Sequence, residues 1–206
     1  MARPKIHDDG LRQRLLASAA ELVHAKGVDG LSMRQLAAVV GTSTTAIYSL
    51  FGGKSELLEA VVMRGFTSFT SAQAEAVGGR DAIVDLRNLG TAYRRWALAN
   101  PTLYTLMFSG ALNDFVRSEE ALSSSTDGLR PLIAAVRLGQ ATRVLRAADP
   151  ESVAMHLWAT VHGLASLELA GLKNDQQDWT VVFESSLEAS LRAWSAEREN
   201  GSWETP

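Results

Sequence analysis

Hydroxyl side chains are concentrated between two cationic residues, Arg34 and Lys54, and no acidic residue interrupts this stretch. The hydroxyls expected to face outward are those of Ser43, Thr44, Thr45, Tyr48 and Ser49. Hydroxyls donate to phosphate oxygens or base edges, and a threonine methyl packs against the methyl of thymine. The flanking cations would contact phosphates, because neutralising them releases counterions from the duplex. The chemistry predicted for this stretch is contact with double-stranded DNA.

Two short helices and a tight turn are expected to position these hydroxyls. Ser32 and Gln35 form a capping-box pattern at the start of the first helix, and Gly41 is expected to end it. The second helix is expected over 44–50, and Gly52-Gly53 should end it. Two helices joined in this way form a helix-turn-helix, whose second helix enters the major groove. Any helical hairpin has the same apolar spacing, so the absence of acids is what favours DNA binding.

A family resemblance follows from the same residues. The unit L-S-M-R-Q-L-A begins at Leu31, and Tyr48, Phe51 and Lys54 then match a Y-x-x-F-x-x-K pattern. Between Leu11 and Val62 the chain therefore resembles the N-terminal domain of the TetR family of transcriptional regulators. The resemblance implies a regulator, most often a repressor, that contacts DNA through Arg34, Thr44, Thr45, Tyr48 and Lys54. Leu50 departs from the family, which often has a histidine or another polar residue there.

The net charge of −3 is unevenly distributed along the chain. Up to Arg64 there are eight basic and six acidic residues, and the remainder holds twelve basic and seventeen acidic residues. The net charge is therefore +2 at the N-terminal end and −5 elsewhere. This predicts DNA binding by one end only, and it argues against a sequence-indifferent packaging protein, which would be basic throughout. Residues 3–5, Arg-Pro-Lys, are expected to form either a solvated terminus or an arm that reaches a neighbouring groove.

Composition limits the class of protein further. The 206-residue chain has no cysteine, which excludes disulfides and suits a reducing compartment. Its first twenty residues lack the apolar region of a signal peptide, and no run of eighteen apolar residues could span a membrane. These features predict a cytoplasmic protein without membrane contact.

Helical periodicity and stop signals predict an all-α fold of about nine helices. A three-helix helix-turn-helix domain is expected over 1–62, and a helical ligand-binding and dimerisation domain over 63–206. Beyond the two short helices, the helices are expected near 9–26, 54–76, 81–100, 102–108, 131–145, 150–170 and 178–197. The serine-rich stretch 122–128 is either a loop or a break in a longer helix, and residues 200–206 should fray.

The last two predicted helices have the composition of an interface. The helix over 150–170 is apolar almost all round and also carries a stripe of small residues, and the last helix has one broad apolar face. These patterns predict a four-helix homodimer interface, although the same residues could instead be buried within one chain. The predicted interface residues are Ala159, Gly163, Ser166, Trp179, Phe183, Leu187, Leu191 and Trp194.

A second resemblance concerns the C-terminal body. Residues 93–97, 100–108, 158 and 162–164 resemble the TetR subgroup with a WHG C-terminal domain, which implies a small-molecule sensor. Large apolar side chains with a few polar groups are typical of ligand sites. The predicted pocket for a small apolar ligand is lined by Tyr93, Trp96, Tyr104, Met107, Phe108, Trp158 and His162. The alternative is an aromatic core in which His162 donates to a backbone carbonyl.

Enzymatic chemistry finds little support in the sequence. His156 and His162 are six residues apart, about 240° around a helix, which does not suit metal ligation. Glu21 and His24 form a single Glu-x-x-His pair, whereas di-metal bundles use two. No G-x-S-x-G motif or phosphate loop occurs. We expect no enzyme activity, no metal and no cofactor, and the alternative function is a helical small-molecule-binding protein or enzyme without specific DNA binding.

Overall fold

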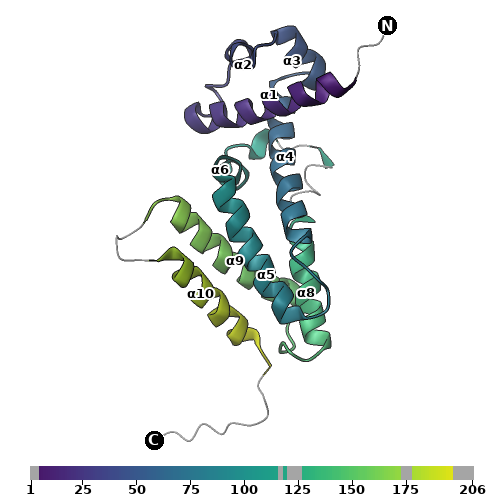
Figure 1. The fold of residues 1–206 in the computed structure, drawn as a ribbon, viewed down its shortest axis with the longest axis vertical. Helices are drawn as coiled ribbons and strands as arrows, with labels where there is room; N and C mark the ends of the chain where they lie inside the picture. The colour runs from purple at the N-terminus through teal and green to yellow at the C-terminus, as the bar shows by residue number, and fades with distance from the viewer. Residues whose placement is uncertain (1–4, 116–117, 120–126, 173–177, 197–206) are drawn as a thin grey trace, which may run out of the picture. The chain divides into compact units, whose positions relative to one another are not determined.

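The computed structural model describes residues 5–115, 118–119, 127–172 and 178–196. These residues form nine α-helices and one short 3₁₀ helix, and their only β pairing is an isolated bridge (Figure 1). The predicted all-α class is confirmed. No helix among the described residues is long and apolar enough to cross a membrane.

The chain divides into two compact units, which we call the first unit (1–70 and 100–128) and the second unit (71–99 and 129–206). The described helices of the first unit are α1 (Lys5–Lys26), α2 (Met33–Val40), α3 (Thr44–Phe51), most of α4 (Lys54–Ala74), α6 (Pro101–Phe108) and the 3₁₀ helix η1 (Asn113–Phe115). Helix α1 packs against α2 and α6. The core of the unit includes Leu15 and Leu16 of α1, Leu36 of α2 and Ile47 of α3, all at most 1% exposed.

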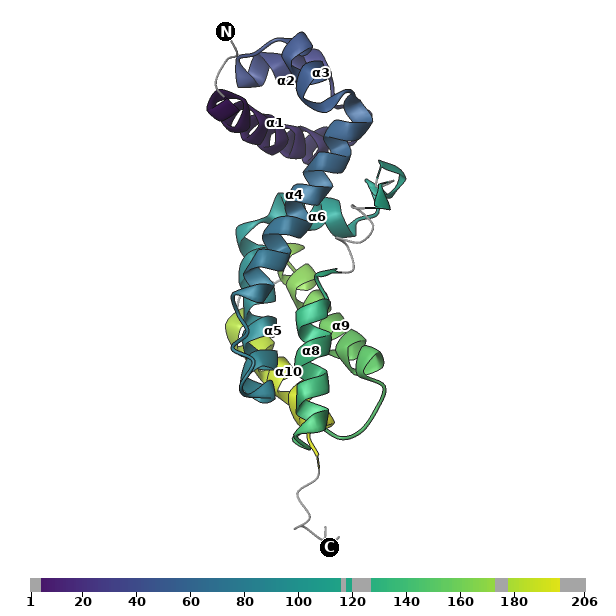
Figure 2. The ribbon, with the colours of Figure 1, turned by 90° about the vertical axis from the view of Figure 1, so that its right-hand side faces the viewer.

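The described part of the second unit is built from four longer helices, with α5 in contact with the other three. They are α5 (Ala82–Ala99), α8 (Arg130–Ala141), α9 (Pro150–Leu169) and α10 (Trp179–Trp194). Helix α5 contacts each of the other three, and α9 also packs against α8 and α10 (Figure 2). The domain limits expected from the sequence, 1–62 and 63–206, stay a prediction. The two compact units are divided differently: α4 runs without a break through residue 62, and α6 is grouped with the first unit.

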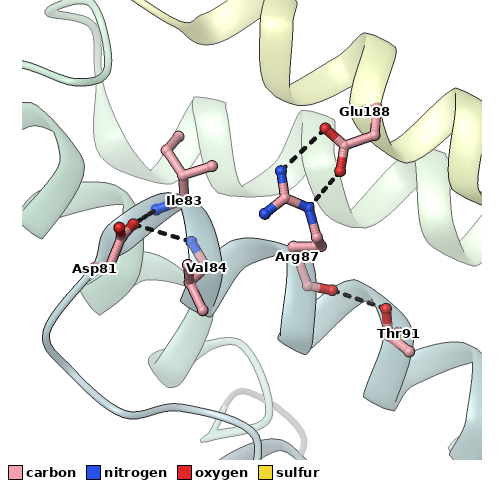
Figure 3. A network of polar contacts seen from close by, with 6 residues as sticks. All are labelled: Asp81, Ile83, Val84, Arg87, Thr91 and Glu188. Carbon is pink, nitrogen blue, oxygen red and sulfur yellow. Dashed lines mark hydrogen bonds and ion pairs between the residues drawn. The ribbon is translucent and has the colours of Figure 1, made fainter.

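Polar contacts fix the start of α5 and its pairing with α10 (Figure 3). The carboxylate of Asp81 accepts hydrogen bonds from the backbone N–H groups of Ile83 (2.9 Å) and Val84 (3.1 Å), as an N-cap does. Further along α5, the Arg87 guanidinium forms a bidentate ion pair with Glu188 of α10. That hydrogen bond lowers the pKa of the Glu188 carboxyl. Because both side chains are partly exposed, we expect the pair to contribute only about 0–1 kcal/mol.

A buried carboxylate that was not predicted from the sequence anchors the loop between α4 and α5. Asp85 is 3% exposed, and its two oxygens accept from the N–H groups of Gly78 (2.8 Å) and Gly79 (2.9 Å). A buried charge is costly unless it is hydrogen-bonded, so these two bonds explain why Asp85 is tolerated inside. The sequence signal was a glycine pair followed by an acid in the first turn of the next helix.

Helix α8 ends at Ala141, four residues before the predicted end near Leu145. The chain turns back because Gly139 has no side chain: a Cβ there would lie 2.7 Å from Leu145, which packs over it. Arg143 adopts a left-handed φ of 58°, and Leu145 then pairs with Ser195 in the isolated bridge. Backbone bonds from Arg146 N–H to Trp194 O and from Ala196 N–H to Val144 O, both 3.0 Å, hold the two segments together.

The other helix limits lie within a few residues of the predictions. Helix α1 begins at Lys5, four residues early, so the predicted arm keeps only residues 3–4, which lie outside the described residues. Helix α10 ends at Trp194, just before the bridge residue Ser195. Its predicted end at Glu197 and the stretch 200–206, which was expected to fray, lie outside the described residues. Most of the serine-rich stretch 122–128, expected to be a loop or a break in a longer helix, also lies outside the described residues.

Candidate nucleic-acid interface

Helix α2 starts and stops at the predicted residues. The Ser32 hydroxyl accepts from the Gln35 N–H at 3.4 Å, which caps the helix. At the other end Gly41 has φ 73° and ψ 44°, a left-handed conformation that glycine adopts without steric cost. The Gln35 side chain serves a different contact from the predicted capping box: its Oε1 accepts from Lys26 Nζ of α1 at 3.2 Å.

Helix α3 is capped by Ser43. The Ser43 oxygen accepts from the Ala46 N–H at 3.1 Å, and its extended backbone (φ −103°, ψ 154°) places it just before the helix. A hydroxyl that accepts one bond still has its proton to donate. Ser43 can therefore cap α3 and also reach a phosphate oxygen.

The two faces of α3 differ sharply in exposure. Ile47 is 1% exposed and belongs to the core, whereas the next residue, Tyr48, is 51% exposed. Among the other predicted DNA contacts, Arg34, Ser43, Thr45 and Ser49 are exposed, and Thr44 and Lys54 are half-buried. Leu50 is half-buried beside them, as are Ala46 and Phe51. The predicted outward residues thus share the solvent-facing side of one short helix and its flanks.

Contacts from α1 support this surface from behind. The Arg12 guanidinium lies 5.2 Å from the centre of the Phe51 ring at the end of α3, within cation–π distance. The Lys26–Gln35 bond joins α1 to α2 in the same unit. Neither contact was expected from the sequence, because each joins side chains of different helices.

No charged side chain lies in the turn between α2 and α3 or in α3 itself. Residues 36–53 include no acid, base, amide or histidine, and the acids next to this stretch are Asp29 and Glu56. Glu56 lies in the first turn of α4, where the helix dipole favours a negative charge. The surface that faces a duplex would therefore be neutral at its centre, with Arg34 and Lys54 at its edges.

Comparison with known proteins identifies the family. Residues 86–190, about half of the chain, match the model described as tetracyclin repressor-like, C-terminal domain, and residues 15–61 match the model of bacterial regulatory proteins of the tetR family. The chain belongs to the TetR family of transcriptional regulators. The C-terminal match is consistent with the predicted resemblance to the WHG subgroup.

Individual relatives of this TetR-family chain agree with the models. It is 41% identical to the HTH-type transcriptional repressor DrrR1 of Streptomyces coeruleorubidus over 51 residues, 25% of this chain and 19% of that protein. It is 27% identical over 96 residues, 46% of this chain, to the HTH-type transcriptional regulator YobS of Bacillus subtilis (strain 168). The chain thus spans half or less of the length of these two curated relatives.

A solved structure matches the TetR-family chain over most of its length. This is the structure of a protein with unknown function from Rhodococcus sp. RHA1, which is 30% identical. The match has a TM-score of 0.76 and covers 90% of this chain and 95% of that one.

The predicted ligand residues of the TetR-family chain lie in both units. In the second unit Tyr93 and Trp96 are buried and Trp158 and His162 are half-buried. The Tyr93 hydroxyl lies 2.8 Å from His162 Nδ1, and the Trp158 and His162 ring centres are 5.2 Å apart. Burial lowers the pKa of the His162 imidazole.

The remaining predicted ligand residues, Tyr104, Met107 and Phe108, belong to α6 in the first unit, with the Tyr104 and Phe108 rings 5.0 Å apart. A surface groove of about 440 Å³ lies between α5 and α10 and includes none of the predicted set. It is lined by Thr91, Arg94, Arg95, Leu98, Ala99, Phe183 and Glu184. Arg94 is already engaged there, because it forms a bidentate ion pair with Glu168 of α9, with both bonds at 2.8 Å.

The predicted interface residues fall into two groups. Four side chains of α10 are at most 8% exposed within their own chain: Trp179, Phe183, Leu187 and Leu191. These four stabilise the fold of the second unit, and little of them is left for a partner. Ala159 is exposed and Gly163, Ser166 and Trp194 are half-buried. The Trp194 indole donates to His156 Nδ1 at 2.9 Å, and Arg146 lies 4.5 Å from the centre of its ring.

Proposed function

We propose that this TetR-family protein is a repressor that binds a near-palindromic DNA site as a homodimer and is released by a small apolar molecule. The observation that carries the proposal is the solvent-facing side of α3, where Thr45, Tyr48 and Ser49 are exposed and no acid repels phosphate. Helix α3 would lie in the major groove and α2 would cross the backbone. Arg34 and Lys54 would contact phosphates on either side.

A second copy of the chain would pack on the outer face of α9. One ridge along that helix consists of residues at successive intervals of four: Met155, Ala159, Gly163 and Leu167. Met155 and Leu167 are 50% and 45% exposed, and a Cβ at Gly163 would meet no atom within 4 Å. Large apolar side chains left in solvent on a ridge with open space beside them suit helix packing across a two-fold axis.

The ligand would act through the second unit. Tyr93, Trp158 and His162 together offer aromatic surface and a polar pair, which suits a small apolar molecule with one hydrogen-bonding group. Such a ligand would release DNA only if it prefers the arrangement that does not fit the operator. The family match favours a regulatory role over an enzymatic one.

Selection of bound sequences from random DNA tests the proposal. We expect enrichment of an inverted repeat whose half-sites are about one helical turn apart, or a multiple of it, and a preference over bulk DNA on the order of a thousandfold. A variant that tests the role of α3 is Tyr48→Ala, which removes an exposed side chain and should weaken DNA binding without changing the oligomeric state. Absence of any enriched sequence would reject the proposed function, and enrichment of a single unrepeated site would reject the dimeric mode.

A further inference from the structure

The side chains that normally discriminate base pairs by paired hydrogen bonds do not occur on the recognition surface. Guanine is read by Arg or Lys, adenine by Asn or Gln, and cytosine by Asp or Glu. Residues 36–53, which cover most of α2, the turn and all of α3, include none of these six types. Arg34 lies in the first turn of α2, the helix expected to cross the backbone.

Hydroxyls alone discriminate weakly, because serine and threonine can bond to either donors or acceptors on base edges. One of the hydroxyl oxygens, that of Ser43, already accepts the capping bond from Ala46 N–H. Apart from hydroxyls, the groups that α3 offers on its exposed residues are the methyl of Thr45 and the ring of Tyr48. Tyr48 is 51% exposed. Among base edges in the major groove, the complementary apolar group is the C5-methyl of thymine.

The spacing of these residues suits contact with neighbouring base pairs. Thr45, Tyr48 and Ser49 stand three and four residues apart, so they share one face of α3. Ile47, on the opposite face, is 1% exposed and fixes that orientation in the core. The methyl of Thr45 and the ring of Tyr48 are therefore presented together on the solvent-facing side.

We propose that Thr45 and Tyr48 select base pairs by packing against C5-methyl groups in the major groove. The recognised groups are the methyls of thymine, and 5-methylcytosine, which carries the same methyl at the same position, can replace thymine at a contacted base. This proposal rests on the proposed DNA-binding function. Its consequence is that C5 methylation of a cytosine at a contacted position raises the affinity of the operator.

The test uses the full-length protein and the selected operator, with thymines replaced one at a time by deoxyuridine. This change removes only the methyl, and each contacted position should lose about fourfold in affinity, measured by fluorescence anisotropy at fixed salt. Replacing a contacted T·A pair by C·G should weaken binding further, and 5-methylcytosine should restore the fourfold part. Thymines outside the half-sites serve as controls and should show no change.

Protein variants assign the effect to a side chain. Thr45→Ser keeps the hydroxyl and removes the methyl, so it should bind thymine and deoxyuridine equally at one position. Thr45→Val keeps a methyl and removes the hydroxyl, so it should preserve the discrimination. Val39→Ala is the matched control, because Val39 is 61% exposed but lies on α2. Thr45 and Val39 both lie on the surface, and Thr45→Val is also isosteric, so thermal melting should confirm that all three variants fold.

The possible results separate the two proposals. An operator that is bound specifically but tolerates deoxyuridine at every position overturns the methyl-reading inference and leaves the proposed function standing. Equal discrimination by wild type and Thr45→Ser at every position removes Thr45 from it. No specific binding to any sequence rejects both proposals.

Discussion

At the scale of single residues, neighbouring positions on α3 have opposite roles. Ile47 is 1% exposed and Tyr48 is 51% exposed, although they are adjacent in the sequence. Helix geometry turns each residue by about 100°, so one side chain packs in the core and the next faces solvent. The core residue fixes the orientation in which the exposed one is presented.

His162 should make the stability of the protein depend on pH. Burial lowers the pKa of its imidazole in the folded state, so the unfolded chain binds a proton first as the pH falls below about 6.5. The stabilising contribution of neutral His162 is present above that pH and is lost as the pH falls through the folded pKa. We expect the melting temperature to fall between about pH 7.5 and pH 5.5, and to fall less in His162→Gln.

Glutamine suits this comparison because its side-chain oxygen can still accept from the Tyr93 hydroxyl, which lies 2.8 Å from His162 Nδ1. His24→Gln is the control, since it makes the same substitution at a histidine that is exposed on α1. Equal pH dependence in wild type and His162→Gln would contradict the role assigned to His162.

Residues with local partners could be predicted from the sequence, and residues with distant partners could not. Ser32 caps α2 through a bond from Gln35 N–H, only three positions away, and its place at the start of that helix was predicted. The burial of Leu187 and Leu191 depends on how α10 packs against α5 and α9, which no periodicity reveals. The sequence could identify an apolar face but not what covers it.

At the scale of elements, two substitutions on α3 should distinguish the effect of its cap on stability from the effect of an exposed hydroxyl on DNA binding. Ser43→Ala removes the oxygen that accepts from Ala46 N–H, so we expect a loss of about 1 kcal/mol in unfolding free energy, measured by denaturant titration. Ser49→Ala is the matched control: Ser49 is exposed on the same helix and caps nothing, so it should weaken DNA binding at nearly unchanged stability. Equal stability of the two variants would show that the cap contributes nothing.

The end of α8 shows why element limits are harder to predict than elements. Its periodicity continues to Leu145, but the helix stops at Ala141 because Leu145 folds back over Gly139 and pairs with Ser195. That pairing joins segments about fifty residues apart in the sequence and also ends α10. A local pattern cannot register a competing contact at that distance.

At the scale of the whole molecule, the net charge differs in sign between the N-terminal part of the chain and the remainder. The part up to Arg64 has a net charge of +2, and the remainder has −5. We therefore expect a duplex to be attracted to the helix-turn-helix rather than to the acidic remainder. With so small a positive excess we expect moderate non-specific affinity, and the contacts proposed for α3 would supply most of the discrimination.

The outer ridge of α9 should determine whether the protein is a dimer. Met155→Lys with Leu167→Lys places like charges in the proposed interface, so light scattering should give the mass of one 22.2 kDa chain. The matched control is Val84→Lys with Val144→Lys, which changes two apolar side chains of similar exposure (44% and 42%) outside that ridge and should stay dimeric. Operator affinity should fall with the dimer, because each chain alone reads one half-site. A ridge variant that stays dimeric would place the interface elsewhere.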